Sequence, residues 1–261
     1  MMNTTEQDSN MENLLHTPQR VDYISDVDGK ADWYMRCDGI KGGDCVVVLH
    51  GHGSNGDQLF TRPDLAPRRD FLAKIGANVI SPNLRDNAWM NPAAVSDLAR
   101  ILEMERSRTQ FRRCILASAS MGGTGSLIFA MRHPEMVDGL VILGAATSIR
   151  RYRDWCAAGD LPIHQEIRKA IDANYTDEAM TANDVCAHAA SLTMPLRFFH
   201  SQADRVIPVS EMRELHRLMA GMPNARFTEI PPLQEAPNWW SDHDAPIREF
   251  IPQVKELLQF S

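Results

Sequence analysis

The sequence of 261 residues contains no apolar run close to the roughly 18 residues that a membrane-spanning helix needs. It has no visible internal repeat or low-complexity segment, and its 15 glycines and 15 prolines are scattered along the chain. Residues 1–20 lack the basic start and the continuous apolar stretch of a signal peptide. We therefore predict a flexible N-terminal tail over residues 1–20, no membrane partner and a cytoplasmic location.

Positive charge is in deficit, with 27 Lys and Arg against 34 Asp and Glu and a formal net charge of −7. Nucleic acids and anionic membranes attract proteins through a basic surface, so this balance predicts neither as a partner. Arg150, Arg151 and Arg153 are compatible with a local basic patch, although a solvated helix face explains them more simply. The five cysteines form no C-x-x-C pair and are odd in number, which suits free thiols in a reducing compartment.

Short apolar runs alternate with longer amphipathic stretches over most of the chain. The predicted strands are 45–50, 77–81, 113–117, 140–145 and 195–200, and the predicted helices are 92–104, 122–132, 210–219 and 245–260. Alternation of this kind requires right-handed crossovers between parallel strands. The expected fold class is therefore α/β, with a mainly parallel central sheet and helices on both faces.

Two segments depart from this alternation. The stretches VDYIS and DWYMRCD, before Asp44, predict an antiparallel strand pair that leads into the sheet. Residues 148–193 contain helical pieces without a clear strand, and we consider both a helical lid and plain helical padding at the sheet edge. The expected organisation is a tail over 1–20 and a single domain over 21–261, with 148–193 as a lid or insertion.

The stretch CILASASMGGTGSL, residues 114–127, contains a candidate nucleophile. An apolar strand is followed by the turn SASMG and a helix, which is the context of a nucleophile elbow around Ser120. The usual elbow pattern is G-x-S-x-G, and here Ser118 stands at the first glycine. The alternative interpretation of Ser120 is an N-capping serine at the start of the helix.

A second strand is followed by a glycine-rich turn in VVVLHGHGSNGD, residues 46–57. Glycines allow the backbone to fold back so that an N–H points into a site, as an oxyanion hole requires. The backbone N–H groups of His52 and Met121 are the natural pair of donors. His50 and His52 also form an H-x-H pair, but no third ligand stands at a recognisable spacing, so we predict no metal site.

Further candidates follow the later apolar runs. Asp204, in RFFHSQADRVIPVS, has the position of a carboxylate that orients an imidazole, and a turn or capping aspartate is the alternative. His243 lies in a polar loop before the terminal helix, where a surface histidine is the alternative. Trp239 and Trp240, just before His243, and Trp89 are candidate substrate-binding residues. One of the adjacent pair is also compatible with packing under the last helix.

The chain order Ser120, Asp204, His243 resembles that of the α/β-hydrolase superfamily. The resemblance extends from about Tyr23 to the end of the chain and includes the HG turn at residues 50–51, the SMGG elbow and the DRVIP acid loop. Within the superfamily, SMGGTGSLIFAMRHPEMVDGLVILGA is similar to the esterase D-like and carboxylesterase-like branch.

The resemblance implies a role for each residue of the triad. Ser120 attacks an acyl carbon, His243 takes the proton, and Asp204 orients His243. The implied function is a serine hydrolase that acts on a small-molecule carboxylic ester, or on a thioester or amide, through an acyl-enzyme and without a cofactor. Two alternatives are a serine peptidase and a non-catalytic binding protein, both with this fold. Two departures from the family pattern are Ser118 and Asp242, which replace the glycines expected at the elbow and before the catalytic histidine.

Overall fold

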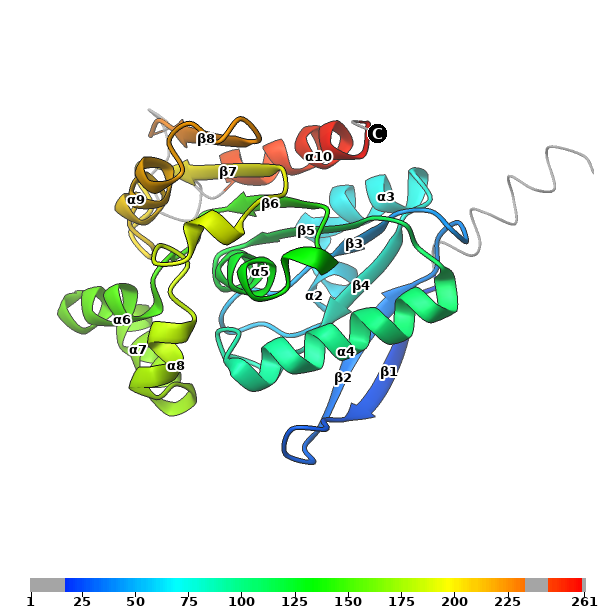
Figure 1. The fold of residues 1–261 in the computed structure, drawn as a ribbon, viewed down its shortest axis with the longest axis horizontal. Helices are drawn as coiled ribbons and strands as arrows, with labels where there is room; N and C mark the ends of the chain where they lie inside the picture. The colour runs from blue at the N-terminus through cyan, green and yellow to red at the C-terminus, as the bar shows by residue number, and fades with distance from the viewer. Residues whose placement is uncertain (1–16, 233–243, 260–261) are drawn as a thin grey trace, which may run out of the picture.

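The computed structural model describes residues 17–232 and 244–259, which fold around one sheet of eight strands (Figure 1). The strands are β1 (Gln19–Ile24), β2 (Ala31–Cys37), β3 (Cys45–Val47), β4 (Asn78–Pro82), β5 (Cys114–Ala119), β6 (Gly139–Leu143), β7 (Leu196–Ser201) and β8 (Ala225–Ile230). Their order in the sheet is β1-β2-β4-β3-β5-β6-β7-β8. Strands β3 to β8 are parallel, whereas β2 is antiparallel to both β1 and β4.

Helices connect the parallel strands and cover both faces of the sheet. They are α2 (Gln58–Thr61), α3 (Ala66–Lys74), α4 (Pro92–Thr109), α5 (Met121–Arg132), α6 (Ile149–Ala158), α7 (Pro162–Asn174), α8 (Asp177–Ala182), α9 (Ser210–Leu218) and α10 (Asp244–Gln259), with short 3-10 turns η1 (Pro63–Leu65), η2 (Pro134–Met136) and η3 (Ala189–Ser191). Helices α3 and α10 lie together on one side of the sheet, and α4 and α5 lie on the other (Figure 1).

Two hydrophobic cores lie on the two faces of the sheet. Neighbouring residues of a strand point to opposite faces, and so Ile115 packs in the core beside α3 and α10 while Leu116 packs in the core beside α4 and α5. Both are almost fully buried. The central strands are apolar on both sides for this reason, as expected of a parallel sheet covered by two helical layers.

The predicted fold class is confirmed, and each predicted strand and helix is present within a few residues of its expected bounds. Strand β1 begins at Gln19, inside the expected tail, because Gln19 and Arg20 pair with Arg36 and Met35 of β2. Helices α2 and α3 were not predicted. Both are short, and the charged run Arg68–Asp70 obscures the apolar spacing of α3.

Helices α6 to α8 form the segment that interrupts the alternation of strands and helices. Its arginines are ion-paired: Arg150 with Asp177 at 2.7 Å, Arg151 with Glu211 at 2.6 Å and Arg153 with Asp172 at 2.7 Å. Neighbouring carboxylates thus offset the positive charge of this cluster, in agreement with the simpler of the two interpretations. Among residues 17–232 and 244–259, no helix combines the length and the apolar content that crossing a bilayer requires.

Candidate active site

Ser120 lies at the sharp turn between β5 and α5, with φ 56° and ψ −129°. Positive φ is costly for a residue with a side chain, and the surrounding structure must hold it in place. The Ser120 N–H does so by donating hydrogen bonds to the carbonyls of Leu143 (3.0 Å) and Gly144 (2.8 Å). The side chain makes no capping hydrogen bond, although Ser120 occupies the N-cap position of α5. The conformation is therefore that of a strained elbow and not of a capping serine.

Close packing around the elbow requires glycine at position 122. A Cβ atom added to Gly122 would lie 2.3 Å from the carbonyl oxygen of Leu49. Position 118 does not require glycine in the same way. Ser118 is buried within β5 and is not among the described residues with positive φ. Its hydroxyl oxygen accepts a hydrogen bond from the N–H of Leu49 at 2.9 Å. Ser118 thus ties the elbow strand to the chain that follows β3, which a glycine cannot do.

The glycine-rich turn after β3 lies beside the elbow. The ring of His50 is fixed in this turn, with Nδ1 2.9 Å from the carbonyl oxygen of Gly51 and Nε2 2.8 Å from that of Asn83. Gly53 adopts φ 76°, which glycine tolerates without strain. Met121 is the first residue of α5, where backbone N–H groups have no acceptor within the helix. These are the two turns to which the sequence assigned the oxyanion donors His52 and Met121.

The loop between β4 and α4, residues 83–91, forms hydrogen bonds with the glycine-rich turn. Asn87 accepts a hydrogen bond from the N–H of Gly53 at 2.8 Å through its Oδ1, and the indole N–H of Trp89 donates to Nδ1 of His52 at 3.2 Å. Five non-glycine residues of this loop have positive φ, and they are Leu84, Arg85, Asp86, Trp89 and Met90. Such backbone persists only where tertiary contacts over-determine it.

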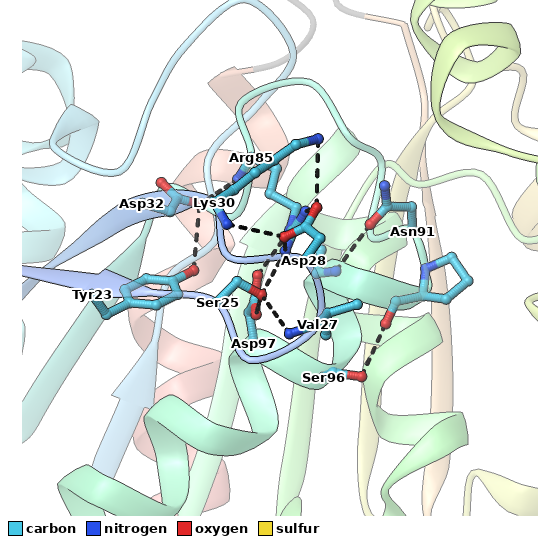
Figure 2. A network of polar contacts seen from close by, with 12 residues as sticks. Tyr23, Ser25, Val27, Asp28, Lys30, Asp32, Arg85, Asn91, Ser96 and Asp97 are labelled. Atoms are coloured by element: carbon cyan, nitrogen blue, oxygen red, sulfur yellow. Dashed lines mark hydrogen bonds and ion pairs between the residues drawn. The ribbon is translucent and has the colours of Figure 1, made fainter.

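A polar network around Arg85 supplies these contacts (Figure 2). The guanidinium donates to Asp97 through Nε (2.8 Å), to Asp28 through Nη1 (2.8 Å) and to Ser25 through Nη2 (2.7 Å). The backbone N–H of Arg85 donates to a carboxylate oxygen of Asp32 at 2.7 Å. The Arg85 guanidinium holds the pKa of Asp28 well below its usual range. The β1–β2 hairpin and α4 therefore fix loop 83–91, which in turn fixes the glycine-rich turn.

Asp204 is buried in the loop after β7, on the same edge of the sheet as Ser120. Its Oδ1 accepts hydrogen bonds from the N–H groups of Val206 (2.8 Å) and Ile207 (2.9 Å). Its Oδ2 lies 3.5 Å from Nε2 of His200, which is itself 2.8 Å from the carbonyl oxygen of Ile207. The carboxylate is thus held by backbone amides in one orientation, as a residue that positions an imidazole requires.

A cavity of about 320 Å³ joins these parts. Ser120, Asp204 and His52 all line it, so the structure brings the predicted nucleophile, the predicted acid and one predicted oxyanion residue to one space. Ile163 and Ile167 of α7 form part of the apolar wall. Residues of the expected insertion therefore line the cavity, a role that no motif in the sequence indicates.

Helices α6 to α8 are also bonded to the loops of the site. The hydroxyl of Tyr152 donates to the carbonyl oxygen of Val206 at 2.9 Å, next to the acid. The hydroxyl of Tyr175 lies 2.7 Å from the carbonyl oxygen of Trp89 and 2.8 Å from that of Met90. Ring Nε2 of His164 lies 2.8 Å from the carbonyl oxygen of Arg205. The segment therefore makes direct contacts on both sides of the cavity.

The structure assigns Trp89 a different place from the one expected of a substrate-binding residue. Its side chain is 1% exposed and is not among the described residues that line the cavity. It packs behind the ring of His52, with 5.9 Å between the ring centroids, because the β4–α4 loop turns it toward the core. The predicted residues His243, Trp239 and Trp240, and the departure at Asp242, lie outside the described residues.

His52 is half-buried, and burial lowers its pKa below the usual value of 6.5. A neutral imidazole accepts the Trp89 N–H at Nδ1, so the proton of the ring stands on Nε2. In the part of the chain that the structure describes, no group of three or more His, Cys, Asp or Glu side chains is arranged to hold a metal ion. The ring of His50 is turned toward two backbone carbonyls instead.

Comparison with known proteins places the site in context. Residues 44–161 match the family model described as the α/β hydrolase fold. A solved structure of FphF, a fluorophosphonate-binding serine hydrolase of Staphylococcus aureus, superposes with a TM-score of 0.70 at 14% identity and covers 93% of this chain and 98% of its own. Esterase Pf2001 of Pyrococcus furiosus superposes with a TM-score of 0.66 at 16% identity, covering 95% of this chain and 94% of its own.

Sequence comparison finds relatives that match only part of this chain. A 2-hydroxy-6-oxononadienedioate/2-hydroxy-6-oxononatrienedioate hydrolase of Escherichia coli is 33% identical over 114 residues, which are 41% of this chain. The match spans 38% of the length of that relative. Similarity at the level of sequence is thus confined to less than half of either protein.

Proposed function

Because the chain has the α/β-hydrolase fold, we propose that it is a serine hydrolase that cleaves a small carboxylic ester through an acyl-enzyme intermediate. The observation that carries this proposal is the strained conformation of Ser120, at φ 56°, in the wall of a cavity that Asp204 also lines. Residues with strained backbone are concentrated at active sites. Two structural neighbours, the serine hydrolase FphF and the esterase Pf2001, support the same reaction class.

The proposed mechanism assigns one step to each group. His243 takes the proton of the Ser120 hydroxyl as the oxygen bonds to the acyl carbon, and Asp204 stabilises the resulting imidazolium. The N–H groups of His52 and Met121 donate to the oxyanion, each lowering the barrier by about 3 kcal/mol. His243 then protonates the leaving alcohol, and a water molecule, deprotonated by His243, releases the acid and restores Ser120.

Substitution of Ser120 tests this mechanism directly. We expect Ser120→Ala to lower kcat toward p-nitrophenyl esters by about 10³-fold or more. Ser126→Ala is the matched control, because Ser126 is a buried serine of the adjoining helix α5 whose hydroxyl donates to the carbonyl oxygen of Gly122. A fluorophosphonate probe should label the wild type and not Ser120→Ala. Retained turnover in a folded Ser120→Ala variant would remove Ser120 from the mechanism.

The nature of the scissile bond follows from a panel of substrates. An esterase predicts turnover of p-nitrophenyl esters without turnover of aminoacyl amides, whereas a peptidase predicts turnover of both, because an activated ester reacts more readily than an amide with any serine nucleophile. A thioester of the same acyl group separates thioesterase from esterase activity. If the folded protein reacts with neither the substrates nor the probe, the non-catalytic alternative gains support.

We also propose that the protein works in the cytoplasm on a small molecule, without a nucleic acid or membrane partner. All five cysteines are free, and four of them are buried, which is consistent with a reducing compartment. The formal charge of −7 is consistent with a partner other than nucleic acid or an anionic membrane.

A further inference from the structure

Gln58 contributes a buried amide to the wall of the cavity that Ser120 and Asp204 also line. It is the first residue of α2 and is only 8% exposed. Its Oε1 accepts a hydrogen bond from the N–H of Gly51, with 3.5 Å between the two atoms. Its Nε2 has no acceptor among residues 17–232 and 244–259, and it is not one of the atoms that the protein encloses completely. The amide nitrogen of Gln58 therefore opens to the cavity.

The hydrogen bond to Gly51 determines which end of the amide faces the cavity. A backbone N–H is a donor and requires the amide oxygen, so the nitrogen with its two N–H groups lies on the other side. Supporting Gly51 needs only an acceptor, whereas a buried donor without an acceptor destabilises the folded protein. The donors of Gln58 are therefore informative about the group that fills the cavity.

His52 supplies a second donor to the same cavity. Its Nδ1 accepts the indole N–H of Trp89, which lies in the core, so the ring is neutral and its proton is on Nε2. The two nitrogens of an imidazole point in widely different directions, and Nε2 therefore faces away from Trp89. In the part of the chain that the structure describes, Nε2 has no acceptor either.

The two donors define the chemistry of the group that they can bind. Oε1 of Gln58 and Nδ1 of His52 already accept hydrogen bonds, so both side chains offer only N–H groups to a ligand. Both side chains are uncharged, and an ether, hydroxyl or ketone oxygen therefore satisfies them without a counter-charge. Apolar residues, among them Leu65, Ile163 and Ile167, contribute to the wall, and ligand sites commonly combine apolar walls with a few polar groups that orient the ligand.

We propose that Gln58 and His52 bind an uncharged oxygen of the substrate, so that the enzyme prefers oxygen-bearing esters to their hydrocarbon analogues. The inference rests on the proposed function, since it names the substrate class of the same site. Gly51, which holds the Gln58 amide, directly precedes the proposed oxyanion donor His52, and the bound oxygen therefore lies a few atoms from the scissile carbonyl. This oxygen belongs either to the acyl group or to the alcohol, and the experiment separates the two.

The test compares esters that differ only by an ether oxygen in place of a methylene group. On the acyl side the pairs are p-nitrophenyl methoxyacetate with the butyrate, and p-nitrophenyl methoxypropanoate with the pentanoate. On the alcohol side the pair is methoxyethyl butyrate with butyl butyrate. Each kcat/KM is divided by the rate constant of hydroxide-catalysed hydrolysis, because an ether oxygen also activates the ester. We expect the wild type to prefer the ether in at least one pair by about 10-fold.

Gln58→Glu separates substrate binding from the support of Gly51. The carboxylate keeps an acceptor for the Gly51 N–H but replaces the two donors with a second acceptor, so the preference for the ether should be lost. Gln58→Met removes the acceptor and the donors and should also lose the preference. His52→Phe should lower the same ratio, since the ring donor is removed, in addition to any loss of kcat that the two esters share.

The matched control is Gln165→Met, the same substitution in α7. Gln165 is not among the described residues that line the cavity, and its Nε2 already donates to the carbonyl oxygen of Cys156 at 3.3 Å. The ether preference of this variant should equal that of the wild type. Equal losses of kcat/KM on both members of each pair in the Gln58 variants would assign Gln58 a purely structural role. An unchanged ratio in His52→Phe would remove His52 from the proposal.

The wild type keeps the inference testable if the Gln58 variants do not fold. Absence of an ether preference in all three pairs would overturn the inference. Ser120-dependent hydrolysis of both members of each pair at equal rates would leave the proposed function intact, whereas no Ser120-dependent hydrolysis of any ester would remove the proposed function itself.

Discussion

The indole N–H of Trp89 donates a hydrogen bond to Nδ1 of His52, with 3.2 Å between the two nitrogen atoms. Trp89 is in the core and His52 lines the cavity, so this bond links the packed interior to the proposed oxyanion turn. Small errors in the position of an oxyanion donor are costly, because the donor must meet charge that develops only in the transition state. Trp89 is therefore expected to affect turnover without touching the substrate.

Trp89→Phe should lower kcat by about 5-fold, with a smaller change in KM, because one hydrogen bond of about 1 kcal/mol no longer orients His52. Steady-state kinetics with a p-nitrophenyl ester provide the measurement. The control is Trp155→Phe, the same substitution in α6, where the indole stacks on Tyr152 at 6.0 Å between centroids. A similar fall in kcat in both variants would contradict a specific role for Trp89.

The protonation of His52 should make stability depend on pH. Burial lowers the pKa of His52 below its usual value of 6.5, an effect that Glu166 opposes and His50 reinforces. Below about pH 6.5 this histidine binds a proton in the unfolded chain but not in the folded protein. The free energy of unfolding should therefore decrease as the pH is lowered from about 6.5 through the folded-state pKa of His52. Above 6.5 the contribution is present in full.

Chemical denaturation between about pH 8 and about pH 5 measures this effect as the difference between wild type and His52→Asn. Asparagine has a side-chain acceptor for the Trp89 N–H and does not titrate, so the stability of the variant relative to the wild type should rise as the pH falls. A difference that stays constant over this range would show that the pKa of His52 is the same in the folded and unfolded states.

Ser118→Ala should destabilise the fold by about 1–3 kcal/mol, because the buried N–H of Leu49 loses its acceptor. Ser118→Gly restores the usual elbow pattern but should be at least as unstable, since glycine adds backbone entropy to the unfolded chain. Denaturant titration of both variants provides the measurement. A gain in stability in Ser118→Gly would show that the glycine of the usual pattern is preferred here for its backbone conformation.

Arg85→Met should lower the unfolding free energy by about 3 kcal/mol, because it leaves the buried carboxylate of Asp97 without its cation. It should also reduce kcat, since loop 83–91 holds the glycine-rich turn. Arg100→Met is the control, because Arg100 pairs with Asp26 at 2.6 Å at the surface and exposed pairs contribute little. Equal stability of the two variants would show that the network is not needed to hold the loop.

Much of the site could be predicted because its parts follow parallel strands. Ser120 follows β5 and Asp204 follows β7, and the carboxyl ends of parallel strands meet at one edge of a sheet whatever the length of the connections. Local signals were sufficient for both, since an apolar run followed by a turn marks each strand end. The fold class was predictable for the same reason.

The loop over residues 83–91 could not be predicted in this way. Its residues with positive φ include Leu84, Trp89 and Met90. Bulky residues such as these rarely adopt positive φ, so their local sequence does not predict it. Contacts with Asp97 and Tyr175, distant in sequence, hold the conformation. The sequence does not reveal these contacts, and Trp89 was therefore predicted to be a substrate-binding residue.

Helix α7 presents Ile163 and Ile167, one turn apart, to the cavity, while tyrosine hydroxyls on both sides of α7 bond to backbone carbonyls of the acid loop and the β4–α4 loop. Carbonyl acceptors are common to every amino acid, so these anchors do not depend on the isoleucines. Substitutions of Ile163 and Ile167 are therefore expected to change the size of the cavity while the hydrogen bonds that hold the acid loop and the β4–α4 loop stay in place.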